Sequence, residues 1–226
     1  MKNRKALQTT LLALAVLGLA AVNAAAVSPI VVPGLYNTGV DSSGTVLPLQ
    51  SLERHYSVSG ASGIAYVEPP VYEPNLGWAW LPAPAGSAWI GPNSTTNTAS
   101  PDPEGMYYYT MQFNLSAFNP ADVRIAGSWM TDNTGDLFLN GVYTGFTTDV
   151  ESYKHLTPFT LSSGFVSGIN TLEFRVLNEY VGPNPSGLCV AGLSATVVPE
   201  PATSALMLGL LAVRAARLFL GRKPQQ

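Results

Sequence analysis

The strongest constraint on the fold of this sequence is a series of short runs in which apolar and polar residues alternate, separated by turn residues. In residues 171–177 every second position is apolar, and Glu173 and Arg175 fall between the apolar positions. Residues 123–129 show the same alternation, with Trp129 on the apolar side. A period of two residues places successive side chains on opposite faces of a strand. The sequence therefore predicts half-buried β-strands, with Trp129 in the core between them.

Further β-rich runs extend this pattern to residue 197. They lie at residues 107–113, 137–139, 188–190 and 193–197. Residues 137–139 lead into Asn140-Gly141, and Asn-Gly is a strong signal for a two-residue hairpin turn. No helical periodicity persists between the two ends of the chain. Many short strands with regularly spaced turns predict an all-β domain, a β-sandwich or jelly roll, over residues 27–197.

The composition excludes several other classes of protein. Charged residues make up 11% of the chain, against about 25% in an average domain, which is too few for a coiled coil or helical bundle. An aromatic content of 10% is too high for a disordered chain. The single cysteine excludes a disulfide scaffold and a Cys-rich zinc site.

The distribution of charge argues against a nucleic-acid partner. Seven of the eleven basic residues lie near the two ends of the chain. Residues 27–198 keep four basic and thirteen acidic residues, a formal net charge of -9. A nucleic-acid-binding domain needs the opposite sign.

Residues 1–26 have the three parts of a secretory signal peptide. Lys2, Arg4 and Lys5 precede an apolar run of twelve residues at 11–22, and three alanines at 24–26 supply a cleavage site. Twelve helical residues span about 18 Å, too little for a hydrocarbon core of about 30 Å. The alternative is a buried amphipathic helix, but the run is apolar on every side. We expect a signal helix recognised by the export translocon and signal peptidase.

The C-terminal end, residues 198–226, carries three features in order: a Pro-Glu-Pro motif, an apolar run at 205–213 and a basic tail. It resembles the PEP-CTERM sorting signal, with the motif at Pro199, Glu200 and Pro201 and the membrane-stop residues at Arg214, Arg217, Arg222 and Lys223. The resemblance implies a transmembrane helix and processing by an exosortase, a membrane protease of bacteria. The sequence departs from the usual pattern because Arg214 and Arg217 interrupt the apolar segment. Charged side chains within a membrane span are costly, so we expect a weak, transient anchor. The alternative is a plain membrane anchor that is never cut.

Residues 69–103 are rich in proline but also hold several aromatic residues. We expect long loops packed over one end of the sandwich, where ligand-facing surface is common. Residues two apart in an extended segment face the same way, so Trp78 and Trp80 are predicted to lie on one side of the chain. An exposed pair of this kind offers a flat apolar surface on which a sugar ring can stack. The alternative is that these aromatic side chains fill the core. The candidate carbohydrate contacts are Tyr72, Trp78, Trp80 and Trp89.

A second resemblance covers nearly all of residues 27–197. Residues 129–141, with Trp129, Asp132-Asn133 and Asn140-Gly141, resemble a recurring stretch of galactose-binding-like β-sandwich domains on PEP-CTERM proteins. Similar stretches lie at residues 37–41, 55–56 and 89–93, and at parts of 159–172 and 178–188. The resemblance implies the galactose-binding-like fold. Domains of this kind are mostly non-catalytic, often bind carbohydrate and often hold a structural calcium ion.

Asp132, Asn133 and Asp136 are candidate calcium ligands, because they offer hard oxygen atoms on a predicted tight turn. The alternative is an Asx turn that leads into the next strand. No other cofactor is expected. The sequence gives little support for catalysis. Neither His55 nor His155 lies at a characteristic spacing from a nucleophile, and Asp149 and Glu151 are close in sequence without any sign that their carboxylates face one cleft.

Taken together, these features predict a non-enzymatic, exported protein of the bacterial envelope. We expect a membrane-anchored precursor that then reaches the cell surface or extracellular matrix. The leading hypothesis is association with extracellular polysaccharide through the loops at residues 72–92. The alternatives are a structural or adhesive matrix protein without a glycan ligand and, third, a glycoside hydrolase.

Overall fold

The computed structural model describes residues 27–60, 66–68, 72–73, 77–78, 80–92, 102–179 and 185–198. The predicted signal peptide and C-terminal helix lie outside these residues, as do Pro199, Glu200, Pro201, Arg214, Arg217, Arg222 and Lys223. Within the described ranges no helix is long and apolar enough to cross a membrane.

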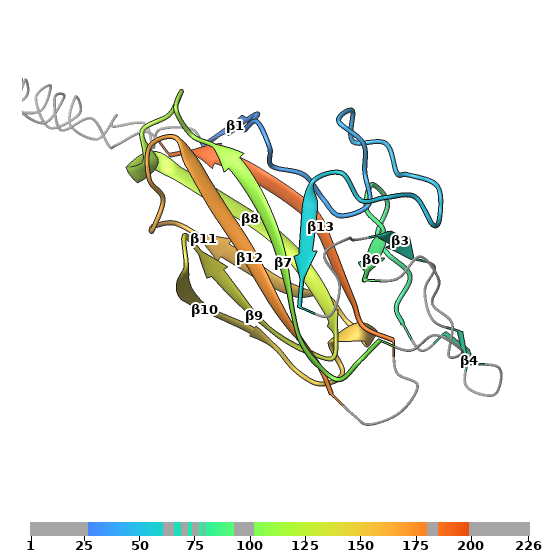
Figure 1. Ribbon diagram of the computed structural model, residues 1–226. Coiled ribbons are helices and arrows are strands. Elements are labelled where there is room, and N and C mark those ends of the chain that lie inside the picture. Colours follow the sequence, from blue (N-terminus) through green and yellow to red (C-terminus); the bar gives the residue numbers. More distant parts are fainter. Residues whose placement is uncertain are drawn as a thin grey trace, which may run out of the picture. The chain divides into compact units, whose positions relative to one another are not determined.

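Two antiparallel sheets form the domain (Figure 1). The six-stranded sheet has the order β11 (Thr157–Leu161), β8 (Val123–Asp132), β13 (Gly187–Val197), β6 (Trp89–Gly91) and β3 (Tyr66–Glu68), and β1 (Ser28–Ile30) pairs with β13. The five-stranded sheet has the order β10 (Val142–Thr148), β9 (Thr134–Leu139), β12 (Ile169–Asn178), β7 (Gly105–Asn114) and β2 (Tyr56–Ser59). A separate pair joins β4 (Tyr72–Glu73) to β5 (Gly77–Trp78).

The helical elements of the described chain are two short 3-10 turns, η1 (Pro120–Asp122) and η2 (Ser152–Lys154). The prediction of an all-β sandwich over the central part of the chain is therefore confirmed.

The core lies between the two sheets and contains the residues that the alternating pattern placed there. Trp129 on β8 is fully buried, and its ring centroid lies 5.3 Å from that of Phe174 on β12. Leu172 and Val176 are buried with Phe174, while Glu173 and Arg175 between them point to the opposite face. The large rings and aliphatic chains of the core come from both sheets, so burial of these faces holds the sheets together.

The predicted hairpin at Asn140-Gly141 is confirmed. Leu139 pairs with Val142, so these two residues form the whole loop between β9 and β10. Their φ angles are +52° and +78°. Positive φ at both positions matches the right-handed twist of the flanking strands, and Asn and Gly are the residues that adopt it most readily.

A smaller apolar cluster covers the outer face of the six-stranded sheet at one end. Trp80 and Trp89 pack there with ring centroids 4.3 Å apart, against Met130 of β8 and Cys189 of β13. This end of the sheet is therefore buried on both faces. Burial also raises the pKa of the Cys189 thiol to about 12, so the reactive thiolate form is disfavoured.

Candidate functional site

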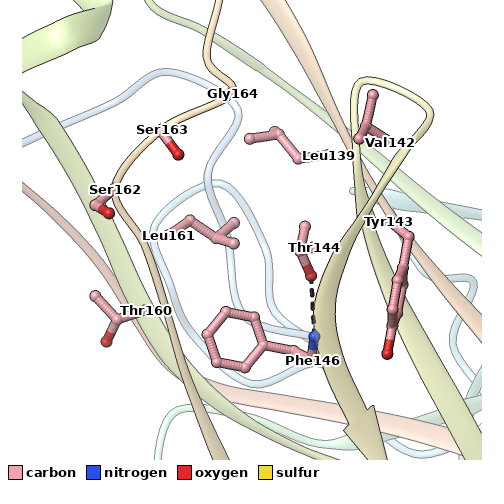
Figure 2. A pocket seen from close by; sticks show the side chains of 10 residues that line it. All are labelled: Leu139, Val142, Tyr143, Thr144, Phe146, Thr160, Leu161, Ser162, Ser163 and Gly164. Carbon is pink, nitrogen blue, oxygen red and sulfur yellow. Dashed lines mark hydrogen bonds between the residues drawn. The ribbon is translucent and has the colours of Figure 1, made fainter.

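A pocket of about 290 Å³ opens between the edge strands of the two sheets, β10 and β11. Its buried floor is formed by Leu139 and Leu161. Figure 2 shows these side chains converging with Thr144 and Phe146, while Tyr143 lies on the other side of the β10 ribbon. We call this site the rim pocket; it is lined by Leu139, Val142, Tyr143, Thr144, Phe146, Thr160, Leu161, Ser162, Ser163 and Gly164.

An irregularity in β10 shapes one wall of the rim pocket. The register between β10 and β9 shifts between Tyr143 and Thr147, and Gly145 has a φ of +87°. The Thr144 hydroxyl donates to the Leu137 carbonyl over 2.7 Å and so takes the place of a backbone donor in the ladder. A bulge of this kind re-aims side chains at a sheet edge. Here Thr144 and Phe146 point into the rim pocket (Figure 2).

Hydrogen bonds from two asparagines hold the opposite wall. The Asn140 side-chain amide donates to the Gly164 carbonyl over 3.0 Å and to Asn170 Oδ1 over 2.9 Å. Asn170 in turn accepts from the Val166 amide and donates back to the Val166 carbonyl. The loop after β11 is therefore tied to the β9–β10 hairpin, so the rim pocket is pre-formed.

The rim pocket is electrically neutral. Its lining residues carry no charged side chain, and Tyr143 is the one titratable group among them. Ser162 and Ser163 are exposed, and neither hydroxyl hydrogen-bonds to another described residue. General acid–base catalysis needs a group that titrates near neutral pH. The arrangement offers an apolar floor edged with hydroxyl groups, which suits a ligand with one apolar face and many hydroxyls.

Two of the four predicted aromatic contacts are corrected by the structure. Trp80 is 1% exposed and Trp89 is fully buried, so neither ring can stack on a sugar from solution. Both fill a core, which was the alternative. Tyr72 and Trp78 occupy paired positions on β4 and β5, and their side chains lie outside the described residues.

The Trp80 ring is fixed by a buried carboxyl group. Its indole N–H donates to Asp132 Oδ2 over 2.7 Å. Burial raises the pKa of Asp132 to about 7, and the nearby Asp102 carboxylate raises it further, while the Trp80 hydrogen bond lowers it. Gly187 leaves room for the ring, because a Cβ atom there would lie 2.6 Å from it.

The predicted calcium ligands do not converge on one point. Asp132 Oδ2 accepts from Trp80, and Asn133 Oδ1 accepts from the Glu179 backbone amide. Asp136 instead sits on the outer face of the five-stranded sheet, opposite Arg175. The described residues contain no group of three His, Cys, Asp or Glu side chains placed to hold a metal ion. This arrangement of the three residues does not fit a calcium site. The alternative, an Asx turn, is not formed by Asn133 either, because its side-chain oxygen accepts a long-range hydrogen bond from the Glu179 amide.

The other sequence candidates for catalysis also have structural partners. His155 Nε2 lies 3.2 Å from Asp149 Oδ2, and Lys154 pairs with Glu151, on an exposed surface. The His55 ring stacks on Tyr36 with centroids 3.8 Å apart, which agrees with a packing role. No pair of these groups lines the rim pocket.

Sequence reasoning missed the rim pocket entirely. Its walls come from residues 139–146 and 160–164, which are close only because both are edge strands on the same side of the sandwich. The available signal was a glycine inside a strand pattern, Gly145, which often marks a bulge.

Comparisons with known proteins return little. No protein-family model and no curated protein matches the chain. Among solved structures, it is similar to a family 35 carbohydrate binding module from an environmental isolate. That similarity covers 43% of this chain and 74% of the module, at 11% identity and a TM-score of 0.27. At these values the function of this chain has to be argued from its own residues.

Proposed function

We propose that the β-sandwich is a non-catalytic module that associates with extracellular polysaccharide, and that the rim pocket is its primary contact. The observation that carries this proposal is the lining of the rim pocket, in which exposed hydroxyls surround an apolar floor without any charged side chain. A sugar ring presents an apolar face and a rim of hydroxyls. Phe146 supplies an aromatic surface, and Ser162 and Ser163 supply unpaired donors and acceptors.

The proposal also includes the finer fold of the domain. Two antiparallel sheets with a packed core agree with a galactose-binding-like sandwich, the finer fold that the sequence resemblance implies. Export, a PEP-CTERM sorting signal and exosortase processing rest on residues 1–26 and 198–226 of the sequence alone. The proposed course is a transiently membrane-anchored precursor that exosortase releases or transfers to the cell surface or matrix.

A binding experiment tests the proposed function. Full-length protein is titrated with the exopolysaccharide of the producing cell by calorimetry. We expect saturable binding without release of reducing sugar. Phe146→Ala, and separately Ser162→Ala with Ser163→Ala, should weaken binding about tenfold, the value of one or two hydrogen bonds or a ring contact. Ser194→Ala, at an exposed position on β13, is the matched control. Binding that survives both rim-pocket variants would exclude the site.

Processing is tested separately. Mass spectrometry of protein from the producing cell should show a mature start near residue 26 and a new C-terminus near Pro199–Pro201. An intact C-terminus in the mature protein would favour the plain membrane anchor.

A structural or adhesive matrix protein is the second candidate. It is favoured by the burial of Trp80 and Trp89, which removes the most aromatic part of the predicted contact surface. Under this hypothesis the calorimetric titration shows no heat of binding at any polysaccharide concentration, while the processing products are unchanged.

A further inference from the structure

The outer face of the five-stranded sheet carries a second cluster of side chains that the rim pocket does not use. Strand register aligns them in two rows across the sheet. One row contains Tyr143, Phe138, Glu173 and Thr110, and the next contains Thr147, Asp136, Arg175 and Tyr108. We call this set the outer-face cluster.

Arg175 is held in one orientation at the centre of the outer-face cluster. Its guanidinium carbon lies 3.5 Å from the centroid of the Phe138 ring and 5.6 Å from that of Tyr108. Its Nε donates to Glu173 Oε1 over 2.6 Å. The terminal nitrogens of the guanidinium hydrogen-bond to no other described residue, and the side chain is 34% exposed. These donors are therefore pre-oriented and face solvent.

Asp136 places an acceptor beside those donors. It lies directly opposite Arg175 in the β9–β12 register. Within the described part of the chain its carboxylate forms no hydrogen bond and no ion pair. Together with Glu173, the cluster thus offers fixed N–H donors and carboxylate acceptors beside aromatic rings on the outer face of the sheet.

We propose that the outer-face cluster binds an extended stretch of a neutral glycan chain. Vicinal sugar hydroxyls both accept and donate, so they match Arg175 on one side and the carboxylates of Asp136 and Glu173 on the other. One positive and two negative side chains give the cluster a formal charge of -1, which disfavours an anionic polysaccharide. This inference rests on the proposed function, because it takes the same class of ligand.

The cluster is long enough for more than one sugar ring and adjoins the rim pocket. From β10 to β7 there are three strand spacings, about 14 Å in all. Tyr143 belongs to the outer-face cluster and also lines the rim pocket, and it lies across the β10 ribbon from Phe146 (Figure 2). A polymer seated in the rim pocket reaches the outer face by passing the β10 edge.

The test compares variants of the full-length protein by affinity electrophoresis in gels that contain dextran, galactomannan or laminarin, three neutral polysaccharides. Arg175→Gln and Asp136→Asn should each weaken retardation by the bound polysaccharide about tenfold. Arg124→Gln removes the same charge from an exposed position on β8, in the other sheet, and should leave retardation unchanged. Asp136→Asn disturbs no contact within the described structure, so it decides the question if Arg175→Gln fails to fold.

The outcomes separate this inference from the proposed function. Wild-type protein that none of the three polysaccharides retards, and that also gives no heat with the producer's exopolysaccharide, overturns both. Retardation that Phe146→Ala weakens but Arg175→Gln and Asp136→Asn do not overturns the outer-face cluster alone. A change in oligomeric state caused by Arg175→Gln, with retardation unchanged, identifies the face as a contact between copies of the chain and also overturns the inference.

Discussion

Replacement of Asp132 by asparagine should remove this residue's contribution to the pH dependence of stability. The wild-type carboxyl has a pKa of about 7 in the folded protein and 3.8 as the reference value. The folded state therefore binds the proton more tightly, so the stabilisation is full below pH 3.8 and is lost as the pH rises through 7. The total loss is about 4 kcal/mol, of which roughly 3 kcal/mol falls between pH 5 and pH 8.

Asp132→Asn keeps an oxygen acceptor for the Trp80 indole but cannot ionise. At pH 8 the variant should be about 4 kcal/mol more stable than wild type, because the wild-type protein then buries a charged carboxylate. At pH 5 the difference should fall to about 1–2 kcal/mol, since the wild-type carboxyl is then neutral in the folded state and ionised only in the unfolded chain.

The assay is urea unfolding of the full-length chain, followed by tryptophan fluorescence, at pH 5 and pH 8. Glu104→Gln, which changes an exposed carboxyl, serves as the control and should follow wild type at both pH values. A variant that is less stable than wild type at pH 8 would refute the reasoning. It would mean that a cationic partner stabilises the Asp132 carboxylate in the folded protein, so that its pKa is not raised by burial.

Four further predictions follow from single positions. Gly187→Ala should lower stability by about 1–3 kcal/mol, seen in the thermal midpoint, because its Cβ would overlap the Trp80 ring. Asn140→Ala should cost about 2 kcal/mol by the same measure, through lost side-chain hydrogen bonds and an unfavourable positive φ; an unchanged midpoint would contradict both predictions. Cys189 should resist iodoacetamide in the native protein at pH 8 and react in urea; native labelling would show that the thiol is accessible. EDTA should leave the midpoint unchanged, and a fall that calcium reverses would reveal a metal site that the described residues do not show.

The sandwich could be predicted because sidedness along a strand is a local property. The alternation around Phe174 and Trp129 identified the buried face of two strands. Asn140-Gly141 set the hairpin for an equally local reason, since few residues adopt positive φ without strain.

The candidate site could not be predicted in the same way. Trp80 was a candidate sugar contact because its spacing from Trp78 indicated a shared face, but spacing does not say whether that face is covered. Asp132, fifty-two positions away, accepts its indole hydrogen and Gly187 leaves space for its ring. Both partners lie far from Trp80 in the sequence, so no local pattern reveals that they cover its ring.

The sequence by itself determined the β-class of the domain, the inward face of its main strands, one hairpin, and the negative charge of residues 27–198. These depend on neighbours in the chain. The tertiary structure decided which strands lie at sheet edges and which side chains meet across strands. The rim pocket joins the edges of two sheets, and the outer-face cluster joins Arg175 to Tyr108, Phe138 and Asp136 on adjacent strands. Such groupings arise from long-range strand order, because pairing, and not sequence distance, sets which side chains become neighbours.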